Sequence, residues 1–271
     1  MPFLNTHGAE LYYETAGNTH HPVLVLLHAG VATLRMWDAQ IDALATDHFV
    51  VRFDARGYGL TTSDGTPFTN HGDVVALLDH LGMPAATLVG SSRGGMIAVN
   101  TALEHADRVD GVVTIGSGIE GFPPTTPTDS ESALFAGISE LTAVGDRPQA
   151  KRLEVELWVF GPQRDAKDLD PAFVARAFEL NQPNVELGEE PPNSVPLHPS
   201  AYSRLATMTA PALITVGDFD VSRMTIIADA LVDALPYAEG HRFANSAHLP
   251  NVEEPHEFLR VLRSWLGRHS L

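Results

Sequence analysis

Short apolar runs alternate along the chain with segments in which apolar residues recur at helical spacing. The runs VLVLLH, from Val23, and FVVRFD, from Phe49, are continuous, which is typical of strands that are buried on both faces. The segment ELYYETAG, from Glu10, alternates and predicts an early antiparallel strand. Helical stripes lie between such runs, the clearest at Val74, Leu77, Leu78 and Leu81, ending at Gly82. This rhythm predicts an α/β fold with a mostly parallel central sheet flanked by helices.

The strand rhythm stops at about Gly121 and returns after Met208. Three helices are expected between these positions, in the region of Leu134, in AKRLEVELWVF and in PAFVARAFEL, followed by a proline-rich connector, QPNVELGEEPPNSVPLHPS. We therefore expect residues 1–120 and 209–271 to form the α/β core and 121–208 to be an inserted helical cap. Its large aromatic residues are interpreted as the core of the cap, with walls of a pocket as the alternative: Trp158, Phe160, Phe173 and Phe178.

The segment VGSSRGG contains the pattern G-x-S-x-G, which fits in one frame only, with Ser92 at its centre and Ser91 beside it. In this pattern the serine occupies a sharp turn between a strand and a helix, where bulky neighbours would collide. The strand ATLVGS precedes Ser92 and the helical segment GMIAVNTALEHA follows it. The sequence around the motif therefore supplies the strand, turn and helix that a nucleophilic serine requires.

A second glycine pattern, at Gly116, Gly118 and Gly121, spells the G-x-G-x-x-G of a dinucleotide site. Such a site needs a helix directly after the strand, because the helix N-terminus holds the pyrophosphate. The segment FPPTTPTDS follows instead, and its prolines exclude an immediate helix. We do not expect a dinucleotide cofactor.

A serine hydroxyl needs a base to remove its proton, and the base needs a third group to orient it. His248 and Asp220 each lie in a loop just after a strand, where the functional groups of a parallel sheet gather. We predict that Asp220 is the acid, in preference to Asp218, which directly follows the end of the strand. Of the other histidines weighed as the base, one lies within a strand and two lie in the last helix: His241, His256 and His269.

Composition narrows the classes of partner. With 17 basic and 34 acidic residues the chain carries a formal charge of −17, which disfavours nucleic acid and anionic membranes and, more weakly, a highly anionic substrate. It has no cysteine, and its 13 histidines show no metal-binding spacing, so we expect no metal site. No apolar stretch is long enough to span a membrane, and the first residues lack the features of a signal peptide. A cytoplasmic protein is expected.

Four stretches together resemble the α/β-hydrolase superfamily: LLHAG, DARGYG, GSSRGG and GDFD with SAHLPNVEEP. Within it, the enol-lactonase and carboxylesterase branch is the most similar, with the cofactor-independent haloperoxidases nearby. The resemblance implies an oxyanion hole formed by the backbone N–H groups of Gly30 and Arg93. It also implies structural roles for His28, Asp54 and Arg56. The Arg93 side chain could bind a substrate carboxylate or form a surface ion pair.

These observations predict a serine hydrolase that uses neither metal nor cofactor and cleaves an ester or lactone of a small organic acid. Ser92, His248 and Asp220 would form its catalytic triad. The same triad also serves carbon–carbon bond hydrolases, acyltransferases and cofactor-free haloperoxidases or perhydrolases. A hydrolase-like receptor that binds a ligand without turnover is the alternative from another class. The sequence leaves the oligomeric state open.

Overall fold

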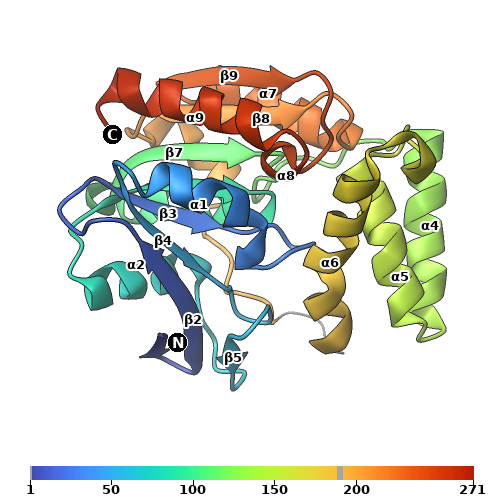
Figure 1. Cartoon of the computed structure of the whole chain (residues 1–271), viewed down its shortest axis with the longest axis horizontal. Helices are drawn as coiled ribbons and strands as arrows, with labels where there is room; N and C mark the ends of the chain where they lie inside the picture. Colours follow the sequence, from blue (N-terminus) through green and yellow to red (C-terminus); the bar gives the residue numbers. More distant parts are fainter. Residues whose placement is uncertain (1, 188–191) are drawn as a thin grey trace.

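The computed structural model describes residues 2–187 and 192–271, and its centre is one sheet of nine strands within those residues (Figure 1). The strand order is β1-β2-β4-β3-β6-β7-β8-β9, with the short β5 paired to β2. From β4 to β9 neighbouring strands are parallel, whereas β2 is antiparallel to β1, β4 and β5. The predicted, mostly parallel sheet is therefore confirmed. The strands are β1 Phe3–Thr6, β2 Ala9–Ala16, β3 Val23–Leu27, β4 Phe49–Phe53, β5 Thr62–Ser63, β6 Ala86–Ser91, β7 Val109–Ile115, β8 Ala212–Gly217 and β9 Ala238–Phe243.

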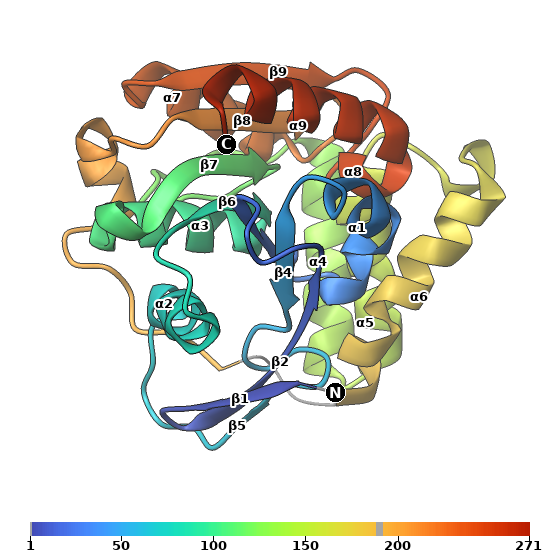
Figure 2. The same ribbon diagram turned by 60° about the vertical axis from the view of Figure 1, so that its left-hand side comes forward.

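Helices cover both faces of this sheet (Figure 2). Alternate residues of a strand point to opposite faces, so Val25 and Leu27 of β3 join one buried cluster and Leu24 and Leu26 join the other. The first cluster includes residues of α2, α3 and α7, and the second includes residues of α1 and α9. The helices are α1 Asp38–Leu44, α2 Asn70–Leu81, α3 Arg93–Glu104, α7 Ser222–Ala234, α8 Pro250–Glu253 and α9 Pro255–His269, with 3₁₀ turns at Leu34–Trp37 and Ala106–Arg108.

A separate group of helices stands beyond the ends to which the parallel strands point (Figure 1). We call this group, residues 129–187, the helical layer. It consists of α4 Asp129–Ala143, α5 Arg147–Glu154, a π-helical turn Val155–Phe160, a 3₁₀ turn Ala166–Asp168 and α6 Pro171–Leu187. A further 3₁₀ helix, Ala201–Thr207, leads back to β8. The domain boundaries expected at 120 and 208 stay a prediction.

Two details of the helical layer differ from the sequence-based expectation. AKRLEVELWVF forms no single α-helix, because the chain changes from α5 into the π-helical turn at Val155. The assignment of QPNVEL to the connector is wrong, since α6 continues to Leu187 with Pro183 inside it. Contacts with other elements favour this longer helix: Asn181 Nδ2 donates to the Lys151 carbonyl at 3.0 Å, and Asn184 Nδ2 donates to the Gly30 carbonyl at 3.2 Å. Residues 188–191 of the connector lie outside the described residues.

Candidate active site

Ser92 lies in the turn between β6 and α3 with an unusual backbone conformation, φ 53° and ψ −113°. Positive φ is rare for a residue with a side chain, so this turn is strained. The flanking glycines make it possible because a Cβ on Gly90 would lie 2.2 Å from the Gly94 carbonyl oxygen. A Cβ on Gly94 would lie equally close to the Leu27 carbonyl oxygen of β3. The turn therefore requires glycine at both positions and presents Ser92 at the carboxyl edge of the sheet.

Asp220 and His248 meet in the interior, although 28 residues separate them in the chain. His248 Nδ1 lies 2.9 Å from both carboxylate oxygens of Asp220, and both side chains are buried. The Val221 N–H donates to Asp220 Oδ1 at 2.7 Å, so the carboxylate is held from two sides. Burial raises the pKa of Asp220, and the charge of His248 opposes that shift. The pair can fix the imidazole with Nδ1 protonated and Nε2 available to accept a proton.

The other candidates lie elsewhere. Asp218 is exposed and forms an ion pair with Arg242 at 3.3 Å. His241 lies in β9, and His256 and His269 are exposed on α9. The geometry therefore brings Asp220, and not Asp218, against the histidine that follows β9.

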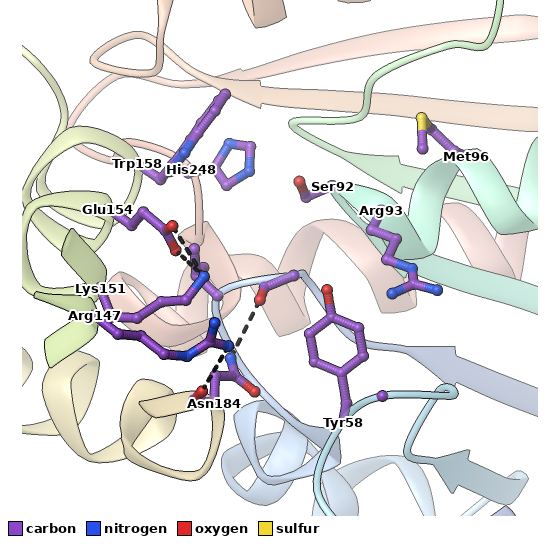
Figure 3. Close-up of a pocket in the computed structure, with 13 residues that line it drawn as sticks. Tyr58, Ser92, Arg93, Met96, Arg147, Lys151, Glu154, Trp158, Asn184 and His248 are labelled. Carbon is purple, nitrogen blue, oxygen red and sulfur yellow. Dashed lines mark hydrogen bonds and ion pairs between the residues drawn. The ribbon is translucent and has the colours of Figure 1, made fainter. Parts of the chain in front are cut away.

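Ser92 and His248 line one cavity of about 360 Å³ (Figure 3). Figure 3 shows the Ser92 hydroxyl facing the cavity, on the side from which the His248 ring approaches. Among the described residues no hydrogen bond joins the two side chains, and such contacts often tighten only when a substrate is bound. The helical layer closes the opposite side with side chains that the sequence did not single out as site residues: Arg147, Lys151, Glu154 and Asn184.

Trp158 also faces this cavity, where its ring lies 4.9 Å from the His248 ring, centroid to centroid, at an angle of 43°. It belongs to the π-helical turn, a feature that recurs at functional sites. Trp158 therefore lines the pocket while it also packs against both buried clusters, so the two interpretations both apply to it. Phe160 and Phe173 are buried and Phe178 packs against the second cluster, as the core interpretation expects. Trp158 thus contributes to the burial of the His248 side chain.

The turn after β3 is held by His28. Its Nδ1–H donates to the Ala29 carbonyl at 2.8 Å, and its Nε2 accepts the Ala55 N–H at 3.0 Å. Burial lowers the pKa of His28 to about 4, so the ring is neutral and can serve as donor and acceptor at once. Because a trans peptide points its C=O and N–H in opposite directions, binding the Ala29 oxygen also orients the Gly30 N–H.

Gly30 lines the cavity, and its own carbonyl accepts a hydrogen bond from Asn184 Nδ2 at 3.2 Å (Figure 3). Arg93 is the first residue of α3, a position whose N–H has no partner within the helix. Both residues that the family resemblance assigns to the oxyanion hole therefore lie at the cavity that contains Ser92.

The loop after β4 is fixed as the resemblance implied. Asp54 accepts the N–H groups of Leu34 and Leu60 at 2.9 and 3.0 Å. Arg56 and Asp73 form a buried two-bond ion pair at 2.8 and 2.7 Å. The side chains of Asp54 and Arg56 are not among those that line the cavity of Ser92. Their role is to hold the loop that carries Tyr58.

Two acidic residues tie the helical layer to the loops that carry Asp220 and His248. Glu131 of α4 accepts the Ser222 N–H and hydroxyl at 2.5 and 2.8 Å, two residues after Asp220. Arg164 forms a two-bond ion pair with Glu253 at 2.7 and 3.0 Å, and Glu253 also accepts the N–H of the residue before His248 at 3.0 Å. The layer is thus bonded to the site that it covers.

Within residues 2–187 and 192–271, no group of three or more histidine, cysteine or acidic side chains is arranged to hold a metal ion. No helix in the same residues combines the length and apolar character needed to cross a membrane.

Comparison with known proteins supports the fold and the reaction class. The family model described as α/β hydrolase fold matches residues 22–255, so the chain belongs to the α/β-hydrolase family. A 3-oxoadipate enol-lactonase of Acinetobacter baylyi is 33% identical over 113 residues, 41% of this chain and 42% of that protein. A 2-hydroxy-6-oxononadienedioate/2-hydroxy-6-oxononatrienedioate hydrolase of Burkholderia vietnamiensis is 30% identical, with 96% of this chain and 93% of that protein covered.

Among solved structures, the enol-lactonase of Burkholderia xenovorans LB400 matches with a TM-score of 0.75 at 23% identity, covering 98% of this chain and all of the other. This likeness shows the shared fold. The predictions of an α/β-hydrolase fold and of a hydrolase related to enol-lactonases are confirmed.

Proposed function

We propose that this hydrolase cleaves an ester or lactone of a small organic acid through an acyl-enzyme formed on Ser92. The observation that carries the proposal is the buried Asp220–His248 pair, which shares one cavity with a serine on a strained turn. Nucleophile, base and orienting acid are the three roles that such catalysis requires. The cavity, at about 360 Å³, suits a small substrate.

In the proposed reaction, His248 Nε2 removes the Ser92 proton while the serine oxygen attacks the carbonyl carbon. The N–H groups of Gly30 and Arg93 stabilise the resulting oxyanion, and removing one such donor typically costs about 3–4 kcal/mol. The proton then passes from Nε2 to the departing alkoxide, which stays tethered to the acyl group if the substrate is a lactone. A water molecule, deprotonated by the same nitrogen, attacks the ester carbon. The bond to the Ser92 oxygen then breaks, Nε2 returns the proton to that oxygen, and the acid is released.

A carbon–carbon bond hydrolase is the second candidate, and one comparison favours it. The relative from Burkholderia vietnamiensis is named for a keto diacid, and hydrolysis of such a compound breaks a carbon–carbon bond. Its match spans nearly the whole chain, whereas the match to the enol-lactonase of Acinetobacter spans less than half. Turnover of simple alkyl esters and lactones, without cleavage of 2-hydroxy-6-oxo dienoic acids, would favour the first candidate.

The adjacent serines provide a matched test of the nucleophile. Ser92→Ala should abolish hydrolysis of p-nitrophenyl butyrate and prevent labelling by a fluorophosphonate, as measured by intact mass. Ser91→Ala should keep both, because the Ser91 hydroxyl is buried and accepts no hydrogen bond among the described residues. Labelling of the Ser92→Ala variant, or equal losses in both variants, would contradict the proposal. Labelling without turnover of any ester, lactone or keto acid would favour the receptor alternative.

A further inference from the structure

The active-site cavity is positively biased within a strongly negative chain. Among the described residues that line it are Arg93, Arg147 and Lys151 and one acidic side chain, Glu154, whereas the whole chain has 17 basic and 34 acidic residues. Lys151 is neutralised locally, since its Nζ lies 2.9 Å from both carboxylate oxygens of Glu154. Arg147 Nη2 donates to the Asn184 carbonyl at 3.4 Å. The side chain of Arg93, the residue after Ser92, is then the cation whose partner has to be identified.

The Arg93 guanidinium is held by neutral groups. Its Nη2 donates to Asn70 Oδ1 at 3.2 Å, and its central carbon lies 4.8 Å from the centre of the Tyr58 ring. Among the described residues no carboxylate lies within ion-pair distance of Arg93, so the surface ion pair considered from the sequence does not form among them. Asn70 is itself fixed, because its Nδ2 donates to Ser194 Oγ at 2.8 Å. The cation is thus oriented in advance and has N–H donors to spare.

Catalysis at the oxyanion requires only the backbone N–H of Arg93, so the side chain must be explained separately. Figure 3 shows its guanidinium and the Tyr58 hydroxyl on one side of the cavity, with Lys151 and Arg147 across from them. A guanidinium presents its N–H groups as a planar fork that matches the two oxygens of a carboxylate. A singly charged group also suits a chain of −17 better than a phosphate dianion does.

We propose that Arg93 binds a free carboxylate of the substrate, with the Tyr58 hydroxyl as a second donor. The inference rests on the proposed function and deepens it: the substrate is a half-ester or lactone that carries a carboxylate. Because Arg93 directly follows Ser92 in the chain, the carboxylate and the scissile carbonyl belong to one small molecule.

The test compares matched substrates that differ only in charge. The monomethyl esters of succinic, glutaric and adipic acid are paired with their carbamoyl analogues, in which a neutral amide replaces the carboxylate, and methanol release is measured. The wild type should prefer at least one acid over its amide by tenfold or more in kcat/KM. Arg93→Met should reduce that ratio by about 10- to 100-fold, the effect of losing a charge-assisted hydrogen bond. Arg93→Lys should keep part of it.

Because Arg93 lies next to Ser92, its substitution can slow the reaction of every substrate. The ratio of kcat/KM for the acid to kcat/KM for the amide is unaffected by such a general loss. Arg260→Met is the charge control, because Arg260 is exposed on α9 and pairs with Glu257, and it should leave the ratio unchanged. An equal or lower rate for the acids in the wild type, or an unchanged ratio in Arg93→Met, would overturn the carboxylate subsite while leaving the ester hydrolase intact.

A binding measurement separates this proposal from the proposed function. By calorimetry, the Ser92→Ala variant should bind the preferred half-ester more tightly than its amide, and adding Arg93→Met should remove the difference. Binding of this kind without any turnover in the wild type would reject the hydrolase mechanism and keep the subsite. Absence of both binding and turnover would reject both.

Discussion

Gly116 lies directly beneath the Asp220–His248 pair, and adding a single methyl group there should disable the enzyme without unfolding it. An ideal Cβ at this position would lie 2.6 Å from Asp220 Oδ2 and 2.9 Å from His248 Nδ1. Ordinary contacts begin at 3.4 Å, so the carboxylate would have to move by about 0.8 Å (3.4 − 2.6) and the imidazole by about 0.5 Å (3.4 − 2.9). Gly116 also has φ +51°, which costs a residue with a side chain about 1–2 kcal/mol.

The cost of positive φ lowers the melting temperature, whereas the displacement of the Asp220–His248 pair lowers the activity. The backbone term is small beside the total stability of a folded domain, so Gly116→Ala should unfold only a few degrees below the wild type. Misplacing catalytic groups by close to 1 Å costs about 100-fold, and we expect kcat/KM for p-nitrophenyl butyrate to fall by that order.

Gly118→Ala provides the control in the same loop. Its Cβ would meet only the flexible end of Met96, at 3.1 Å from the sulfur, so activity should change little. Wild-type kcat/KM in Gly116→Ala would refute the argument, since the pair that the methyl group displaces could not then be the catalytic one. A large fall in melting temperature would mean that the loss of activity comes from unfolding.

Four further outcomes are expected. Asp220→Asn should lower kcat by a factor on the order of 10⁴, because the amide leaves the histidine in the wrong tautomer. Asp218→Asn should lower kcat much less, and the reverse ranking would contradict the assignment of Asp220 as the acid. Asn184→Leu should lower kcat about tenfold with little change in melting temperature, because the Gly30 peptide loses its hydrogen bond. Burial lowers the pKa of His28 from 6.5 to about 4, so between these pH values only the unfolded chain binds the proton. The free energy of unfolding should therefore fall by about 3 kcal/mol on acidification through this window, and denaturant titrations of His28→Asn should lack that part of the fall. Activity should survive prolonged EDTA, and a loss that zinc restores would reject the serine mechanism.

The Ser92 turn and the positions of Asp220 and His248 could be predicted because their sequence signals are local. Gly90 is required by a backbone contact within the turn and Gly94 by the neighbouring strand β3, but both belong to one short motif. Asp220 and His248 follow strands that periodicity identifies. The prolines of FPPTTPTDS also predicted correctly that no helix follows the GxGxxG pattern directly, since α4 begins only at Asp129. The structure supplies another reason for the first glycine of that pattern: Gly116 leaves room for the Asp220–His248 pair.

The side chains that close the cavity could not be predicted, for physical reasons. A π-helical turn adds a residue to one turn, so the 3.6-residue spacing that would place Trp158 on a face no longer applies after Val155. Asn184 follows Pro183, a residue that normally ends a helix, and its side chain bonds both to Asn181 within α6 and to the Gly30 carbonyl outside it. Helical spacing identifies an apolar face, but it does not say which loop that face meets.

The contacts of the helical layer should link substrate specificity to reaction rate in this enzyme. Several contacts join the layer to the core, and beside the Arg164–Glu253 ion pair three of them reach different loops of the site. Asn184 binds the Gly30 turn, Glu131 binds Ser222 in the loop of Asp220, and the Trp158 ring lies 4.9 Å from the His248 ring. Asn184 and Trp158 therefore both line the cavity and contact the loops that carry the proposed catalytic groups. A substitution in α5 or α6 that admits a larger substrate will shift at least one of these loops, because packed elements transmit small displacements. Changes of specificity in this layer should for that reason alter kcat together with KM, whereas changes at Arg93, which is held by Asn70 and Tyr58 instead, should separate the two.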